Sequence, residues 1–197
     1  MPKTGLTQDQ IRQRAIEHTI ARMRKFGYEK VRLSDIAKDM GITHAALYSH
    51  FADKAALFDA VSERFICDLD SKLEQVCNDK SIKSSLDRIT KWFLILHRAK
   101  KEKVNNDPEI YRAFNYSAQI EKDFVKCHLA LMHEHLNSMV KRAIDDGQIK
   151  GDPANISILL LTSTIDFHHP VMVAERADEK REQLLAQILT TLYKGLK

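Results

Sequence analysis

A short stretch of small, polar and aromatic residues in the amino-terminal third could recognise hydrogen-bonding groups on another molecule. On a helix that begins near residue 43, the outward positions and the helix end hold Thr43, His44, Ala45, Tyr48, Ser49, His50 and Lys54. Hydroxyl and imidazole groups can bond base edges, and a lysine ammonium can pair with a phosphate. We therefore predict base-edge and nearby backbone contacts from Thr43, His44, Ala45 and Tyr48. Tyr48, His50 and Lys54 are expected to contact phosphates and so fix this helix in the major groove of duplex DNA.

The residues on either side of Thr43 predict the helix pair that would present this surface. Ile36 and Ala37 supply an apolar contact and a small residue in a first helix. Gly41 follows four residues later, where a tight turn requires positive φ. Ile42 and Leu47 then bury the second helix against the first. The spacing indicates a helix-turn-helix.

Flanking signals place this pair between two longer helices. Thr7 and Gln10 form a T-x-x-Q capping box, and an apolar periodicity continues from there until Gly27. A further helix is expected from Asp53 to about Asn78, with apolar residues at helical spacing. It is long enough to connect this region rigidly to the rest of the chain.

Residues 27–57 resemble the tetracycline-repressor (TetR) family of bacterial transcription regulators. The resemblance rests on Gly27, Ile36-Ala37, Gly41-Ile42, the run Leu47-Tyr48-Ser49-His50-Phe51, Lys54 and Leu57, which match the family pattern G, I-A, G-apolar and L-Y-x-H-F-x-x-K-x-x-L. It covers about the first 60 residues, and the remainder is similar only in length and helical pattern. The resemblance implies binding to a palindromic operator in double-stranded DNA as a homodimer, with an unknown small-molecule effector.

One position departs from the family pattern. Arg32 stands where the family usually has a serine or threonine that caps the first helix of the motif. Ser34 lies close enough to serve as the cap instead, and the arginine adds a charge suited to a phosphate or a base edge. By resemblance, Arg32 and Ser34 join the residues expected to contact DNA.

Beyond residue 80 the sequence stays helical. Its breaks fall at serine, glycine and proline positions, and no stretch alternates like a strand. We predict an all-α fold with a three-helix helix-turn-helix domain over residues 1–54. A larger helical bundle for ligand binding and dimerisation is predicted over residues 55–197.

The last two helical stretches carry more apolar surface than one core contact can cover. Residues 153–168 are apolar on most sides, and residues 178–196 carry leucines and isoleucines over a wide arc. In the resembling family, the same pair of helices from a second subunit covers this surface. The expected interface residues are Leu160, Leu184, Leu185, Ile188, Leu189 and Leu192.

Aromatic and histidine residues along the second domain are candidates for a ligand pocket. The selected residues are Phe93, His97, Tyr111, Phe114, Phe124, His128, Phe167 and His168. An apolar pocket with a few polar groups is the usual form of a small-molecule site. The alternative is an ordinary packed core, because aromatic residues at helical spacing serve that purpose too.

Charge is unevenly divided along the chain. The whole sequence has a net charge of +4, and residues 1–54 hold ten Lys and Arg against six Asp and Glu, so the rest of the chain is neutral. A basic segment on a neutral body suits attraction to phosphate. A solvated helix face would explain the same arginines.

Several functional classes receive no support from the sequence. Common catalytic motifs are absent, no histidine pair has i, i+4 spacing, and the three cysteines lack C-x-x-C spacing. We therefore expect no enzyme activity, cofactor, metal or disulfide, with the cysteines reduced and packed as small hydrophobes. The opening MPKTGL shows no signal-peptide core, and the longest apolar run is too short for a membrane, so a cytoplasmic location is expected.

Together these features predict a homodimeric DNA-binding transcription regulator, with a ligand-responsive repressor as the expected form. Two alternatives stay open at this stage. One is a helical dimerisation or protein-interaction module, and the other is an activator without small-molecule control. An enzyme of novel type would need converging acid, base or nucleophilic groups, for which the sequence offers no motif.

Overall fold

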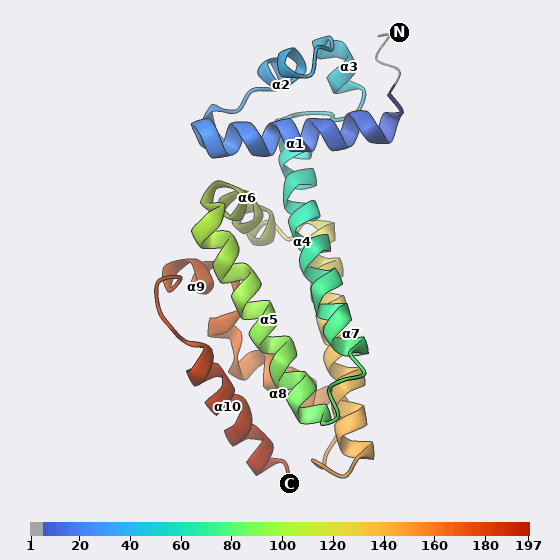
Figure 1. Cartoon of the computed structure of the whole chain (residues 1–197), viewed down its shortest axis with the longest axis vertical. Helices are drawn as coiled ribbons and strands as arrows, with labels where there is room; N and C mark the ends of the chain where they lie inside the picture. Colours follow the sequence, from blue (N-terminus) through green and yellow to red (C-terminus); the bar gives the residue numbers. More distant parts are fainter. Residues whose placement is uncertain (1–5) are drawn as a thin grey trace. The chain divides into compact units, whose positions relative to one another are not determined.

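The computed structural model describes residues 6–197, so the expectation drawn from the amino-terminal MPKTG lies outside it. The fold is all-α, as predicted, with no strand among the described residues (Figure 1). The longer helices are α1 (Gln8–Phe26), α4 (Lys54–Asn78), α5 (Ser85–Asn106), α6 (Pro108–Gln119), α7 (Asp123–Asp145), α8 (Pro153–Ser163) and α10 (Glu182–Gly195). The shorter ones are α2 (Leu33–Asp39), α3 (His44–Tyr48), α9 (Pro170–Glu175) and the 3₁₀ turns η1 (Tyr28–Lys30) and η2 (Ile165–Phe167).

The described chain divides into two compact units. The head unit comprises residues up to Phe65 together with Asp107–Ile120, and the body unit comprises Ile66–Asn106 and Glu121–Lys197. Helix α4 contributes residues to both. The predicted domain boundary after residue 54 falls inside the head unit and stays a prediction about independently folding domains.

Helix α6 belongs to the head unit, whereas its sequence position had suggested the larger domain. It packs against α1 and η1. The rings of Tyr111 and Phe114 lie 6.2 and 5.5 Å from the ring of Phe65, and both are buried. Arg24 on α1 donates two hydrogen bonds, of 2.5 and 2.9 Å, to the carboxylate of Asp107 just before α6. These contacts make α6 part of the head's own core.

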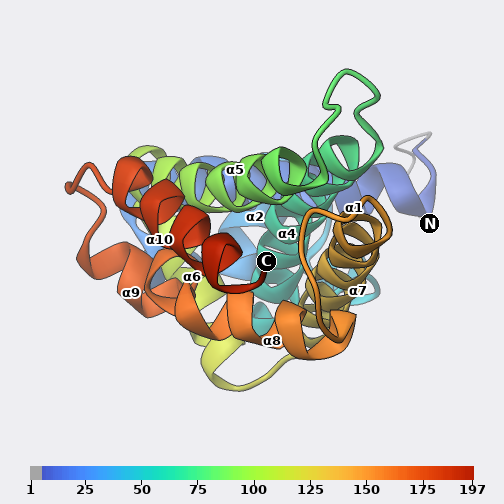
Figure 2. The ribbon, with the colours of Figure 1, turned by 90° about the horizontal axis from the view of Figure 1, so that it is seen from below.

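The body unit is built on α5, α7 and α8. Helix α7 packs on α5 and on α8, and α10 packs on both α5 and α8, as Figure 2 shows from below. Trp92, Leu96, Leu136 and Leu160 are fully buried among them. Helix α9 covers a further part of α5.

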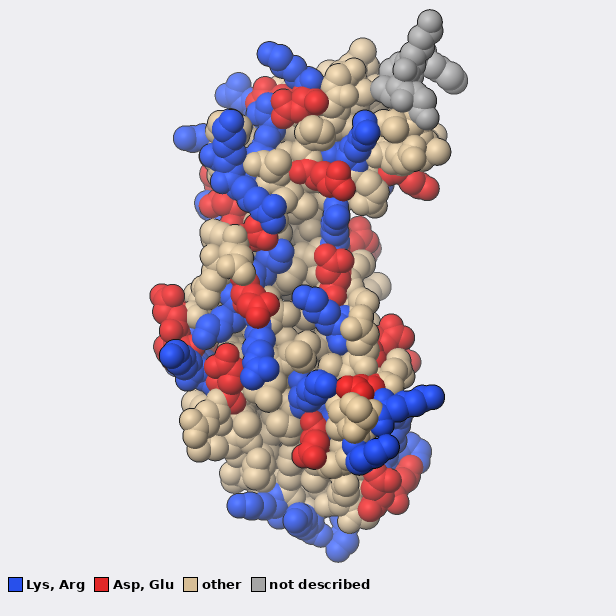
Figure 3. Space-filling model, viewed as in Figure 1, with Lys and Arg blue, Asp and Glu red and all other residues tan. Residues whose placement is uncertain are grey.

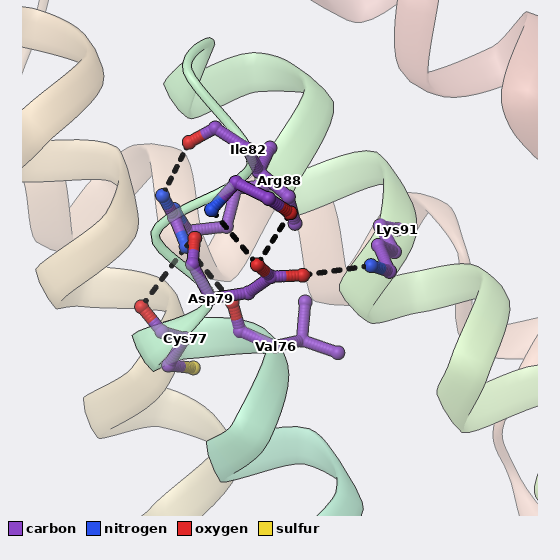
Figure 4. Close-up of polar contacts among 7 residues, drawn as sticks. Val76, Cys77, Asp79, Ile82, Arg88 and Lys91 are labelled. Atoms are coloured by element: carbon purple, nitrogen blue, oxygen red, sulfur yellow. Dashed lines mark hydrogen bonds and ion pairs between the residues drawn. The ribbon is translucent and has the colours of Figure 1, made fainter.

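A buried arginine closes the end of α4 in the body unit (Figure 4). Arg88 of α5 donates to the carbonyls of Val76, Cys77 and Asp79 through Nη1, at 3.0, 3.2 and 2.7 Å, and to that of Ile82 through Nη2, at 2.6 Å. The last carbonyls of a helix have no partner within the helix and carry partial negative charge. The guanidinium therefore satisfies the end of α4 and ties it to α5.

Candidate nucleic-acid interface

The turn between α2 and α3 has the geometry that its glycine predicts. Gly41 has φ +66°, with no atom within 4 Å of where a Cβ would stand. The amide of Ile42 donates to the carbonyl of Ala37 at 3.0 Å, and that of Gly41 donates to the carbonyl of Lys38 at 3.1 Å. This pair of bonds is a Schellman motif, which ends α2 and directs the chain into α3.

Helix α3 begins at a threonine cap and presents an aromatic pair outward. The hydroxyl of Thr43 accepts from the amide of Ala46 at 3.1 Å, so it caps the helix while staying exposed. The rings of His44 and Tyr48 pack edge to face at 4.6 Å, and Tyr48 is 42% exposed. Leu47 is fully buried on the opposite side.

The candidate DNA-contacting residues share one unit and differ in exposure. Seven are exposed, namely Arg32, Ser34, Thr43, His44, Ala45, Tyr48 and Ser49, whereas His50 and Lys54 are half-buried. Lys54 Nζ donates to the carbonyl of Glu29 at 3.1 Å and lies 5.0 Å from the ring centre of Phe58. Its ammonium is therefore held at the start of α4.

Ser34 does not cap α2, contrary to the sequence prediction. Arg32 occupies the N-cap position, and no side chain accepts from the first amides of the helix. The position of α2 is instead fixed from α1. Arg22 donates to both carboxylate oxygens of Asp39, at 2.6 and 2.9 Å, and lies 3.3 Å from Asp35. These hydrogen bonds lower the pKa of Asp39.

The lysines and arginines that give residues 1–54 their net positive charge do not form one continuous patch on the face shown in Figure 3. Figure 3 shows lysines and arginines interspersed with acidic side chains over that face. Part of this mixing is explained by the ion pairs of Arg22 and Arg24 with Asp39 and Asp107. Attraction to phosphate would therefore depend on individual side chains more than on a uniform field.

The candidate pocket residues fall in different places. Tyr111 and Phe114 lie in the head core, and Phe124 is half-buried at the start of α7. The remaining five, all buried in the body unit, are Phe93, His97, His128, Phe167 and His168. His97 Nδ1 bonds the carbonyl of Phe167 at 2.9 Å.

A cluster of buried polar side chains lies between α4, α5 and α7 in the body. His128 Nδ1 is 2.5 Å from Asp70 Oδ1, and Lys100 Nζ donates to the carbonyl of His168 at 2.8 Å. Burial lowers the pKa of Lys100 to about 8. Sequence reasoning missed Asp70 and Lys100. For Lys100 the sequence did offer a signal, because this charged residue lies at helical spacing from Phe93 and His97, on the face expected to be buried.

An apolar cavity of about 250 Å³, open to solvent along a wall that includes the exposed Leu129, Ile158 and Ile165, adjoins this cluster. Its lining includes Leu129 and Met132 of α7, Ile158 and Leu161 of α8, and Ile165 and His168. The volume is close to the lower end of the range for small-molecule sites, about 300 Å³. His168 belongs to both the cavity wall and the polar cluster.

His168 predicts a pH dependence of stability. Burial lowers its pKa to about 3 in the folded protein, whereas the unfolded chain takes up the proton near the ordinary value of 6.5. Because the unfolded state then binds more protons, stability falls as pH drops below about 6.5. We expect His168 to contribute a loss of about 1.4 kcal/mol between pH 7.5 and 5.5.

Urea unfolding at the two pH values would measure this contribution. His168→Gln keeps a side-chain N–H that can donate to the carbonyl of Leu161, the bond that His168 Nε2 makes at 3.1 Å. This variant should lose that part of the pH dependence, whereas His169→Gln, at the exposed neighbour, should keep it. An unchanged slope in His168→Gln would contradict the assignment.

Several large apolar side chains of the body remain exposed. On α8, Ile158 and Leu159 are 52% and 41% exposed, and Leu184 on α10 is 46% exposed. Of the predicted interface residues, Leu160, Leu185 and Leu189 are fully buried within this chain, so they belong to its own core. Ile188 and Leu192 are half-buried.

The remaining chemical groups were also located. Cys67 and Cys127 are exposed and Cys77 is half-buried, and none of the three is in a disulfide within residues 6–197, so the expectation that all three pack as small hydrophobes is wrong. Within residues 6–197, no three His, Cys, Asp or Glu side chains converge as metal ligands. None of the described helices has both the length and the apolar character needed to cross a membrane.

The head therefore presents an exposed helix-turn-helix, and the body is a helical bundle with a few polar side chains buried in an apolar core and exposed apolar residues on α8 and α10. Residues 16–61 match the family model "Bacterial regulatory proteins, tetR family", and residues 86–189 match "Tetracyclin repressor-like, C-terminal domain". The chain belongs to the TetR family. The resemblance seen in residues 27–57 is thus confirmed.

The individual proteins that this chain resembles share only a low sequence identity with it. A nucleoid occlusion factor, SlmA of Alteromonas mediterranea, is 26% identical over 123 residues, which span 62% of this chain and 60% of that protein. A putative transcriptional regulator of Pseudomonas aeruginosa PAO1 has 14% identity and a TM-score of 0.69, with 98% of this chain and 92% of that one covered. SmeT, the repressor of the Stenotrophomonas maltophilia efflux pump SmeDEF, has 20% identity and a TM-score of 0.66, covering 98% and 91%. SmeT has also been solved with triclosan. At these identities, the two structures show the fold alone.

Proposed function

We propose that the protein is a DNA-binding transcription regulator that represses by occupying an inverted-repeat operator as a homodimer. The observation that carries this proposal is the exposed α3, which is braced by the α2–α3 turn and presents Thr43, His44 and Tyr48 outward. Helices of this type enter the major groove with their first residues against the base edges. Family membership supports the same function.

The proposed dimer uses the exposed faces of α8 and α10. Ile158, Leu159 and Leu184 are large apolar residues left in contact with solvent. Apolar surface of this kind usually marks an interaction site. A two-fold axis through it would place two α3 helices in successive major grooves, roughly 34 Å apart.

The proposed control is a small molecule bound by the body unit. The apolar cavity and the buried polar cluster beside it support this part of the proposal. SmeT, a repressor of similar fold, has been solved with triclosan, which supports an apolar aromatic class of ligand. Because α4 contributes residues to both units, a change in the body could be passed along it to the head.

Substitutions in the head separate base contacts from phosphate contacts. A selection of genomic fragments by the purified protein would first supply the operator. His44→Ala should change the preference at one base pair in each half-site, by about 1–3 kcal/mol. Lys54→Ala should weaken binding to all DNA sequences alike. It should also lower the slope of log affinity against log salt concentration by roughly one unit. Gel-shift titrations over a series of salt concentrations measure both effects.

Lys141→Ala is the matched control, because Lys141 is an exposed lysine of the body that pairs with Asp145 in its own helix. It should leave affinity, preference and salt slope unchanged. If His44→Ala and Lys54→Ala also leave all three unchanged, the placement of α3 on DNA is wrong. Binding of a protein partner without any salt-sensitive DNA binding would favour the interaction-module alternative.

A further inference from the structure

A buried imidazole nitrogen of His128, in the body unit, makes no hydrogen bond among residues 6–197. His128 Nδ1 lies 2.5 Å from a carboxylate oxygen of Asp70. An ionised carboxylate only accepts hydrogen bonds, so Nδ1 carries the proton and Nε2 presents a lone pair. Nε2 is buried and has no hydrogen-bond partner among residues 6–197. A buried acceptor without a donor is unfavourable, and native proteins seldom leave one.

The surroundings keep this imidazole neutral. His128 is only 2% exposed, and its burial lowers its pKa, with the nearby ammonium of Lys100 adding to the effect and Asp70 opposing it. His135 on the same helix also lowers it. Near neutral pH the Nε2 lone pair is therefore available. Asp70 fixes the ring orientation, as a carboxylate does for a histidine that acts as a ligand.

We propose that His128 Nε2 is the polar anchor for the effector, and that the effector is an apolar compound with a hydroxyl or N–H donor. This inference rests on the proposed function, in which the body unit binds a small molecule. It narrows the ligand class to compounds with a donor, because a donor pairs with the buried lone pair of His128 Nε2. An ether, ester or hydrocarbon of the same size leaves Nε2 unpaired.

The apolar part of such a compound has a place beside the anchor. Met132 lies one helical turn after His128, on the same buried face of α7, and it lines the 250 Å³ cavity. Methionine is flexible and adapts its shape readily. A shift of the Met132 side chain would join the cavity to the imidazole.

A carboxylate ligand fits this anchor less well than a neutral hydroxyl. The carboxylate would bring a second negative charge toward Asp70 and would offer no hydrogen to Nε2. A phenol offers a hydrogen to Nε2 without adding a negative charge beside Asp70. The neutral donor is therefore the group that satisfies His128 Nε2.

A pair of isomeric probes tests the inference on the full-length protein. The compounds 4-butylphenol and 4-propylanisole have the same atoms, but only the phenol has a hydrogen-bond donor. Trp92, the sole tryptophan, is buried on α5 with its Nε1 bonded to His135 of α7, so its fluorescence reports binding in this region. We expect the phenol to bind at least about tenfold more tightly than the anisole. The imidazole nitrogen NMR signal of His128 Nε2 should shift with the phenol alone.

Two variants make the assignment specific. His128→Phe removes the lone pair, so the preference for the phenol should disappear. His133→Phe, at an exposed histidine that also lines the cavity, should keep it. If His128→Phe does not fold, the NMR shift in the wild-type protein decides the question.

The outcomes separate this inference from the proposed function. Equal affinity for the two probes, or a phenol that leaves the His128 signal unmoved, would overturn the anchor. A water molecule held on Nε2 in the presence of the phenol would do the same. If compounds without a donor release the protein from its operator as effectively as phenols do, the proposed ligand response is supported and the role of His128 as the anchor is wrong. A protein that never binds an operator would instead refute the proposed function.

Discussion

The double substitution Ile158→Glu with Leu184→Glu should convert the protein into a folded monomer and weaken operator binding by at least about 100-fold. Both side chains are largely exposed within the protomer, at 52% and 46%, so a carboxylate there costs the single chain little. Across an apolar two-fold interface, the same carboxylates would be buried without partners. A monomer contacts one half-site and loses the advantage of binding both halves together.

Light scattering and gel shifts on one preparation measure the two effects, with circular dichroism to confirm that the chain stays folded. Tyr116→Glu provides a matched control for the assembly state, because Tyr116 is a 54% exposed apolar residue on α6 in the head unit. That variant should stay dimeric. A wild-type protein that is monomeric at micromolar concentration, or a double variant that stays dimeric, would exclude this interface.

Arg88→Met should lower the free energy of unfolding by about 3 kcal/mol. The buried guanidinium satisfies four backbone carbonyls at the end of α4 and in the loop that follows. Methionine fills a similar space but leaves these acceptors without their donors. Urea unfolding followed by the fluorescence of Trp92, on the same helix as Arg88, gives the measurement.

Lys91→Met is the control for removing a positive charge nearby. Lys91 is exposed and donates to Asp79 at 3.0 Å, so its loss should cost less than about 1 kcal/mol. Arg88→Lys should fall between the two, because an ammonium keeps the charge but cannot reproduce the fork of donors. Equal stabilities for Arg88→Met and Lys91→Met would show that the carbonyls find other partners.

The helix-turn-helix was predictable from sequence because its determinants are local. A capping box at Thr7 and a glycine at residue 41 act through hydrogen bonds within a few residues of themselves. The buried Leu47 and the exposed His44 and Tyr48 follow from helical periodicity alone. For the same reason, the positions expected to face DNA could be chosen before any fold was known.

Periodicity could not say which face of α10 is covered by its own protomer. Leu184 and Leu185 are neighbours in sequence and equally apolar, yet the first is 46% exposed and the second is fully buried. The difference arises from the packing of α10 on α5 and α8, which lie far away in the chain. The residues to substitute in a test of the dimer interface can therefore be chosen only from the tertiary structure.

Long-range packing also decided the location of α6 and the chemistry of the body interior. The sequence around Tyr111 reads as an amphipathic helix, and only its contacts with Phe65 and α1 assign it to the head. Asp70 and His128 are far apart in sequence, and helix packing alone brings their side chains within hydrogen-bonding distance. Sequence periodicity determined the helices and the surface expected to face DNA. The tertiary structure decided which polar groups are buried together, because burial depends on distant segments of the chain.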